Sequence, residues 1–481
     1  MPKKIQEAGL TPSQAFHPDR GLQAALMETQ MDPSPSPSVS PLLQQRRQLL
    51  VPLLCWLALV VDGYDIIIYG ATLPGILETE GWGVTTQSAA MVGSISMIGV
   101  AVGAVFAGVL TDVYGRRKLF LISLSLFSIA ALGCALAPNF AVFGFWRVVS
   151  GLGIGGIMPT IVALAAEFSA PGRRSRTVGL VMTGPLVGGL LGSSAALMML
   201  ESAGFRPIYA LGAVALITVL PVAYARLPES AVFLRSQQRH AEAEAIASRY
   251  GVQLVPTSGI PSSEDSRSPI GKLFEGRNRW STPGLWAMMF ICLLLTYTVL
   301  TWLPQMLVAG GMELNEALQF FVYFNISAVV GTALWAFLAD RIGSKLVVTM
   351  SLTLSAVGYV MLAVGGTTWV GIGVVIAGFG GGSGFSYLAD HIAGFYPAEI
   401  RASGLGWATG FGRLAGIAGP SYGGLFVTLS AGNVSMVGWA LAAPAAAGAV
   451  LMSILPRGPH SSMETPTMDV PRDTPPVASE V

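Results

Sequence analysis

Long apolar runs dominate this chain and restrict the folds that it can adopt. Between residues 49 and 455 the sequence contains twelve runs that are long, mostly apolar and nearly free of charge. A helix needs about 20 apolar residues to cross the hydrocarbon core of a bilayer. We therefore expect an all-α membrane protein with twelve transmembrane helices. The expected spans are residues 49–70, 91–111, 119–138, 141–166, 177–199, 207–226, 284–308, 317–339, 346–365, 369–391, 403–428 and 434–455.

The overall composition is typical of an integral membrane protein. Hydrophobic residues make up 52% of the chain and charged residues only 11%, whereas soluble domains carry about 25% charged residues. The three cysteines, Cys55, Cys134 and Cys292, all lie within expected spans and lack the spacing of metal ligands. Neither a disulfide framework nor a metal site is expected.

Basic residues predict which ends of the spans face the cytoplasm. Nearly all of the 27 Lys and Arg residues fall in the tails and in alternate loops, including the runs 116–118 and 173–176. The loops between them, for example residues 71–90 and 310–316, carry none. Because cytoplasmic loops are enriched in Lys and Arg, we expect a multi-pass protein of the inner (cell) membrane with both termini in the cytoplasm.

The spans divide into two groups of six, separated by a polar loop. The beginning of the chain, which includes DPSPSPSVSP, and its end have no apolar periodicity, as is typical of disordered segments. The expected organisation is a disordered cytoplasmic tail (1–45), a six-helix bundle (46–227), a central cytoplasmic loop (228–282), a second six-helix bundle (283–456) and a disordered cytoplasmic tail (457–481).

The two halves carry the same short motif at nearly the same place. GVLTDVYGRRK at 108–118 and WAFLADRIGSK at 335–345 share a Leu-x-Asp-x-x-Gly core, and RTVGL at 176–180 is echoed by RASGL at 401–405. Two echoes at a similar offset indicate a parallel duplication. Glycine permits a tight turn and the basic run anchors it at the inner interface. The turns therefore predict cytoplasmic latches, and the residues expected to gate them are Asp112, Gly115, Arg116, Asp340 and Gly343.

Two acids interrupt the first apolar run, LVVDGYDIIIYG at 59–70. Asp62 and Asp65 are three residues apart, so they share a helical face that Tyr69 continues. A charged side chain at mid-membrane costs about 2.5–3.5 kcal/mol, so two acids on one face imply a wet cavity or protonation. A carboxyl that binds a proton on one side and releases it on the other suits a proton-coupled carrier. Alternatively, one aspartate only bonds to neighbouring helices or caps a break at Gly63.

Several motifs together resemble the major facilitator superfamily over about residues 45–456. They are the Asp-x-x-Gly-Arg-Arg-Lys turn, RVVSGLGIGG of the fourth span and PESAVFL after the sixth. Within that superfamily DGYDIIIYG and PAEIRASGLGWATGFGRLAG resemble the aromatic acid:proton symporters. By motif match, the resemblance implies functional importance for Asp62, Asp65, Asp112, Gly115, Asp340, Gly343 and Arg147.

This resemblance implies a transporter and not an enzyme. It implies import of an aromatic carboxylate, benzoate or a hydroxybenzoate, by proton symport through alternating access. The expected partners are the substrate, protons and the lipid bilayer, with no cofactor, no nucleic acid and no second subunit. The alternative is a carrier of the same fold for another substrate. PESAVFL favours a sugar importer, and TGPLVGG at 183–189 resembles a motif of drug:proton antiporters, although a small-residue helix contact is the favoured interpretation of these residues.

A carboxylate substrate needs a cation, and two arginines lie within the spans. A guanidinium can bind a carboxylate through two hydrogen bonds, so Arg147 and Arg413 are both candidates for substrate binding. Either can instead be structural, and the sequence does not decide between them.

The remaining candidates are aromatic or lie at the end of the tenth span. Tyr69, Tyr297 and Trp302 are the best candidates to contact the substrate ring, because the first and seventh spans line the cavity in this fold. Membrane helices carry aromatic residues routinely, so packing is an alternative for each. Asp390 and His391 can gate or relay protons, or can be structural residues of the interface.

Overall fold

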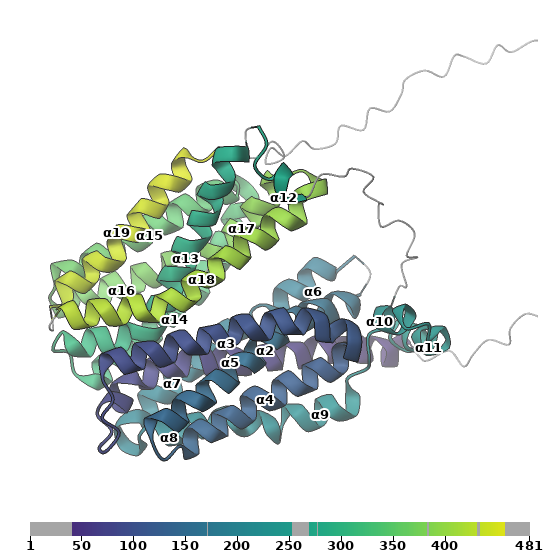
Figure 1. Ribbon diagram of the computed structural model, residues 1–481, viewed down its shortest axis with the longest axis horizontal. Helices are drawn as coiled ribbons and strands as arrows, with labels where there is room; N and C mark the ends of the chain where they lie inside the picture. Colours follow the sequence, from purple (N-terminus) through teal and green to yellow (C-terminus); the bar gives the residue numbers. More distant parts are fainter. Residues whose placement is uncertain are drawn as a thin grey trace, which may run out of the picture. The chain divides into compact units, whose positions relative to one another are not determined.

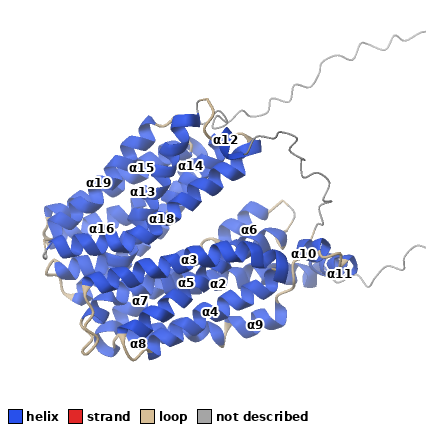
Figure 2. Ribbon diagram, in the orientation of Figure 1, coloured by secondary structure: helices blue, strands red, loops and turns tan. Residues whose placement is uncertain are grey.

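The computed structural model describes residues 41–170, 172–252, 269–276, 278–381, 384–430 and 433–456. Within these residues every regular element is a helix (Figure 2). The chain separates into two units, Met1–Arg47 and Gln48–Val481, and all contacts given below lie within the second. The predicted tail 457–481 lies outside the described residues, as do residues 1–40 of the predicted tail 1–45.

The helices fall into three groups along the chain (Figure 1). The first group is α2 (Pro41–Leu77), α3 (Thr86–Tyr114), α4 (Arg116–Leu136), α5 (Phe140–Glu167), α6 (Arg174–Val181), α7 (Gly184–Ala203), α8 (Phe205–Gly212), the 3-10 helix η2 (Ala213–Leu216) and α9 (Val219–Arg226). The central loop contains α10 (Ala231–Ser236), α11 (His240–Tyr250) and α12 (Pro269–Lys272). The last group is α13 (Asn278–Ala309), α14 (Leu314–Ile342), α15 (Ser344–Val364), α16 (Thr367–Gly381), α17 (Gly384–Phe395), α18 (Ala398–Ser430) and α19 (Val434–Ile454).

Eleven of the twelve predicted spans coincide with helical segments that are long and apolar enough to cross a membrane. The predicted span 403–428 lies within α18, which is 33 residues long. That helix is long enough to cross, but its many glycines dilute its apolar character. A twelfth crossing therefore stays a prediction, as does the cytoplasmic position of the termini.

Two predicted spans of the first half are interrupted rather than continuous. The span 177–199 is divided between α6 and α7, and Pro185 in the first turn of α7 explains the break because its nitrogen cannot donate a helical hydrogen bond. The span 207–226 is divided among α8, η2 and α9. Such breaks are tolerated in membrane helices where neighbouring helices satisfy the freed backbone groups.

Glycines bring α2 and α7 into direct backbone contact. A Cβ atom on Gly63 would lie 2.2 Å from the carbonyl oxygen of Pro185, and one on Gly188 would lie 1.9 Å from the carbonyl oxygen of Val60. Any larger residue at either position would force the two helices apart. Since Gly63 lies between the two aspartates, this contact fixes the rotation of α2 that decides where each acid points.

The two halves meet at one end of the spans. α3 packs against α18 and α7 against α14 (Figure 1). The Ser94 and Ser421 hydroxyls lie 2.8 Å apart, and the backbone of Gly70 lies against Leu300. On α3 these contacts lie near Thr86, whereas the basic turn follows Tyr114 at the other end of that helix. The halves are therefore held together at the ends remote from the basic turns.

Candidate functional site

Two carboxyl groups lie inside the protein on α2. Asp62 is 1% exposed and Asp65 2% exposed. An ionised carboxylate in such a place needs either a counter-charge or a proton. The structure gives the two acids different surroundings, as the following contacts show.

Asp65 forms a buried ion pair with Arg147 of α5. Its Oδ2 lies 2.9 Å from Arg147 Nη1, and both side chains are less than 5% exposed. The Ser150 hydroxyl donates to the same oxygen at 2.8 Å. Ser150 follows Arg147 by one helical turn, so both residues point from α5 toward α2. Ser150 was not among the residues predicted from the sequence, although its spacing from Arg147 is visible in RVVS.

Tyr69 supports the arginine of this pair. The guanidinium carbon of Arg147 lies 5.1 Å from the centre of the Tyr69 ring, a distance typical of a cation–π interaction. The Tyr69 hydroxyl donates to the carbonyl oxygen of Ala89 at 2.6 Å, and its ring stacks on Phe143 at 6.3 Å. In this structure Tyr69 is therefore a platform for Arg147, with no free ring face.

Asp62 faces the second half of the protein. Among the described residues it makes no ion pair, and its Oδ1 has no hydrogen-bond partner. Tyr297 of α13 interacts electrostatically with both Asp62 and Arg413 of α18. Arg413 is exposed, and it makes no ion pair within the described ranges. Asp62, Tyr297 and Arg413 are defined here as the interface cluster, because Tyr297 lies within electrostatic reach of one charge from each half.

Trp302 holds α13 to α18. Its side chain is fully buried and its indole N–H donates to the carbonyl oxygen of Pro420 at 2.7 Å. The indole ring also covers Gly423 and Gly424. No face of this ring is open to a substrate in the present conformation, so its predicted contact with a substrate ring stays a prediction.

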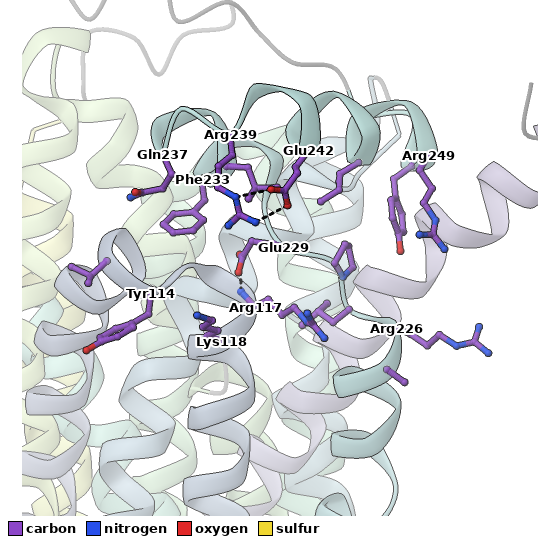
Figure 3. A pocket seen from close by; sticks show the side chains of 17 residues that line it. Tyr114, Arg117, Lys118, Arg226, Glu229, Phe233, Gln237, Arg239, Glu242 and Arg249 are labelled. Carbon is purple, nitrogen blue, oxygen red and sulfur yellow. Dashed lines mark hydrogen bonds and ion pairs between the residues drawn. The ribbon is translucent and has the colours of Figure 1, made fainter. Parts of the chain in front are cut away.

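The first predicted latch closes on the beginning of the central loop (Figure 3). Arg116 forms an ion pair with Glu167 at 2.7 Å, and the Ser230 hydroxyl donates to the same Glu167 oxygen at 2.6 Å. Glu229 accepts the backbone N–H of Arg117 at 3.0 Å. The turn itself needs glycine, since Gly115 has a φ of 90° and a Cβ there would collide with Glu229. The motif PESAVFL thus contacts the basic turn directly.

A pocket opens beside this latch. Figure 3 shows its side chains, which come from the α3–α4 turn, the end of α9, α10 and α11. Arg239 and Glu242 pair across its rim at 2.6 Å. None of the predicted proton or substrate residues lines it. The pocket therefore belongs to the latch and not to the candidate substrate site.

Comparison with known proteins establishes the family. The family model of the Major Facilitator Superfamily matches residues 55–420, with a second match over 317–478. The chain belongs to the major facilitator superfamily. It is accordingly a multi-pass membrane transport protein and not an enzyme, and the all-helical fold predicted from the sequence is confirmed.

Relatives of this superfamily member include transporters of aromatic acids, which confirms the predicted resemblance. The gallate transporter of Pseudomonas putida is 30% identical over 88% of this chain and 95% of its own. The benzoate transport protein of Acinetobacter baylyi is 27% identical, over 79% of this chain and 83% of its own. Among solved structures, the xylose transporter XylE from E. coli in a partially occluded inward open conformation has a TM-score of 0.65 at 17% identity. That match covers 85% of this chain and all of XylE, and it shows the shared fold.

The second latch of this facilitator is built differently from the first. Gly343 again has a positive φ, 85°, and the Asp340 side chain is exposed. Lys345, at the position of Arg117, donates to the carbonyl oxygens of Ser453 and Leu455 at the end of α19. The second turn therefore anchors the last helix, whereas the first turn anchors the central loop.

Asp390 lies on the exposed face of α17 and His391 on its buried face. Asp390 is exposed, as is the Asp112 side chain in the first latch. His391 is 3% exposed, packs against Phe395 at 6.4 Å and interacts electrostatically with Lys345. This position next to the second latch is compatible with the predicted gating role, which stays a prediction.

Proposed function

We propose that this facilitator imports an aromatic carboxylate together with protons across the inner membrane by alternating access. The observation that carries the proposal is the buried Asp65–Arg147 pair, one helical turn from a second buried acid, Asp62, which makes no ion pair among the described residues. Two acids and two arginines inside a membrane protein mark a site for charged ligands. The relatives named for gallate and benzoate support an aromatic carboxylate as the ligand, because both compounds combine a ring with a carboxylate.

Asp65 is the proposed proton carrier. Its ion pair is satisfied in the ionised form, with Arg147 and Ser150 both donating to Oδ2. A proton on Asp65 would remove the counter-charge of a buried guanidinium, which is expensive to leave unpaired. The protonated state therefore favours a rearrangement of α2 against α5. This charge balance is the physical link between proton binding and a change of conformation.

Arg413 is the proposed anchor for the substrate carboxylate. Arg147 already has its counter-ion, whereas Arg413 is exposed and makes no ion pair in the described part of the chain. A substrate carboxylate at Arg413 would approach Asp62, and two negative charges there repel each other. A proton on Asp62 removes that repulsion, so substrate and proton bind together. Tyr297 can add a hydroxyl donor from α13.

The present conformation is proposed to face the cytoplasm. The halves touch at the ends of α3 and α18 remote from the basic turns. Basic loops are enriched on the cytoplasmic side of membranes, so these contacts close the external side. In the opposite state the Ser94–Ser421 contact must open while the cytoplasmic ends come together.

Uptake by the purified protein in liposomes tests this function. We expect benzoate, gentisate, gallate or 4-hydroxybenzoate to accumulate when the outside is made acidic, and an uncoupler to abolish the accumulation. Xylose is the control substrate, because the xylose transporter XylE has the same fold but is only 17% identical to this chain. Equal accumulation of an aromatic acid with and without the proton gradient would contradict symport. Transport of xylose and of no aromatic acid would overturn the substrate class.

A further inference from the structure

Three buried polar atoms beside the Asp65–Arg147 pair have no partner among the described residues. They are Asp65 Oδ1, Arg147 Nε and the hydroxyl of Tyr209. They come from three helices, α2, α5 and α8, and the side chains that bear them are at most 4% exposed. Buried polar groups are almost always hydrogen-bonded. Three unpartnered groups at one place indicate a shared partner that is not part of the protein chain.

Contacts place the Tyr209 hydroxyl near the ion pair. Tyr209 interacts electrostatically with both Arg147 and Asp65. Its ring lies edge-on to Phe143 at 5.2 Å, and Phe143 lies one helical turn before Arg147 on α5. The same phenylalanine stacks on Tyr69, the platform of the guanidinium. Tyr209 therefore approaches the pair from inside the first half, whereas the interface cluster lies toward the second half.

The Tyr209 side chain is packed among aromatic neighbours. The residue is fully buried, and its ring lies edge-on to both Phe143 and Phe205. Thr72 is a polar neighbour whose hydroxyl is near enough to interact with that of Tyr209; its own proton goes to the carbonyl oxygen of Ile68 at 2.6 Å. Tyr64, also buried in this half, does donate its hydroxyl to a carbonyl, that of Ile208, at 2.7 Å. Tyr209 thus differs from Tyr64, because its hydroxyl donates to no backbone carbonyl and makes no well-formed hydrogen bond among the described residues.

We propose that Tyr209, Asp65 and Arg147 together bind one water molecule, which delivers the proton to Asp65 and takes it away. The water accepts hydrogen bonds from Arg147 Nε–H and from the Tyr209 hydroxyl, and it donates one to Asp65 Oδ1. Three bonds are the usual number for a buried water. This inference rests on the proposed proton role of Asp65 and adds to it a site for water and a positioning residue, Tyr209.

Proton transfer at this site is a simple exchange. When a proton reaches this water, the water passes the proton of its own hydrogen bond to Asp65 Oδ1 and remains neutral. The carboxyl becomes neutral, and the Arg147 charge remains over the Tyr69 ring. The reverse step returns the proton to the water. The proton thus reaches Asp65 from within the first half, while the substrate approaches the interface cluster, so the two ligands need not share one path.

Tyr209→Phe isolates the hydroxyl from the ring. It keeps the contacts with Phe143 and Phe205 and removes a hydroxyl that makes no well-formed hydrogen bond among the described residues, so we expect little change in stability. We expect accumulation driven by the proton gradient to fall by up to about tenfold, as for a lost hydrogen bond between neutral groups. Exchange of labelled for unlabelled substrate without a gradient should continue. The pH dependence of accumulation by this variant should differ from that of the wild type.

Tyr64→Phe is the matched control. It removes the hydroxyl of a buried tyrosine in the same half that bonds to a carbonyl, so it should lower the melting temperature and affect accumulation and exchange equally. Wild-type accumulation and an unchanged pH profile for Tyr209→Phe would overturn the proposal. If wild-type protein shows no proton-driven uptake at all, the proposed function fails instead, and the water site is judged by the measurement below.

Radiolytic footprinting tests the water in the wild-type protein and does not depend on transport or on the folding of a variant. X-ray radiolysis of a bound water oxidises the side chains next to it, even where bulk solvent has no access. We expect oxidation of Tyr209 despite its complete burial. Trp302 is equally buried and its N–H is already donated to Pro420, so it should stay unmodified. An unmodified Tyr209 would exclude the water.

Discussion

Asp65→Asn separates the charge of the ion pair from its shape. The asparagine amide oxygen can still accept from Arg147 Nη1 and from Ser150, which now lie 2.9 and 2.8 Å from the carboxylate. The negative charge, however, is lost, and the variant resembles a permanently protonated Asp65. Arg147 then carries a buried charge without a counter-ion.

The expected size of the effect follows from the burial of the pair. Both side chains are less than 5% exposed, and removing one partner of such a pair costs about 3–5 kcal/mol. Because the amide keeps one hydrogen-bond acceptor, we expect the lower end, about 3 kcal/mol. For a bundle of roughly 200 residues this corresponds to a fall in melting temperature of about 6–12 °C.

Asp62→Asn is the matched control, because Asp62 is equally buried and makes no ion pair among the described residues. It should leave the melting temperature unchanged or raise it, since it removes a buried charge that has no partner. The double variant Asp65→Asn with Arg147→Gln should recover much of the stability, because no charge stays unpaired.

Thermal unfolding in detergent and uptake in liposomes give two independent readouts. For Asp65→Asn we expect the lower melting temperature, loss of proton-driven accumulation and continued exchange of labelled substrate. The reasoning fails if Asp65→Asn accumulates substrate as the wild type does. It also fails if Asp62→Asn destabilises the protein as much as Asp65→Asn, because burial and not the ion pair would then set the stability.

Two further substitutions examine the other parts of the transporter. Arg413→Gln should weaken substrate binding by about 10–100-fold, the range of a lost charge-assisted hydrogen bond, with little change in melting temperature. Binding titrations compare it with the control Arg279→Gln, which replaces an exposed arginine at the start of α13. Equal substrate affinities for both variants would remove Arg413 from the site. Glu167→Gln removes the charge that Arg116 pairs with, so trypsin should cut the central loop faster. The control Glu244→Gln, on the exposed face of α11, should not change the cleavage rate. An unchanged cleavage rate for Glu167→Gln would show that the latch does not depend on this ion pair.

The length of the apolar runs was sufficient to predict where most helices lie, because the bilayer sets a minimum length for a crossing helix. It could not predict the interruption of the span 207–226 into α8, η2 and α9. No proline stands at the start of η2, and the local backbone depends on tertiary neighbours. The break before α7 had a visible signal in Pro185, which the prediction of a continuous span 177–199 did not use.

Helical periodicity was sufficient to place Asp62 and Asp65 on one face, but not to tell which acid meets Arg147. That choice depends on the rotation of α2, which is fixed by the backbone contacts of Gly63 with Pro185 and of Gly188 with Val60. Such contacts involve residues more than 100 positions apart and leave no local pattern. Tyr209 gave no signal either, because an aromatic residue in an apolar run is ordinary; only its unpartnered hydroxyl distinguishes it.

The position of both acids on one helix makes a short route for coupling. Seen down the axis of α2, residues three apart point about 60° from each other, so Asp65 meets α5 while Asp62 lies in the interface cluster. A small rotation of α2 together with α7 therefore changes the surroundings of both carboxyls at once. Gly63 and Gly188 bind α2 to α7 so closely that the two helices must move as one body. Because α7 packs against α14 of the second half, such a movement reaches the contact between the halves directly. Neutralising Asp65 can thus change the conformation of the transporter without a long chain of intermediate residues.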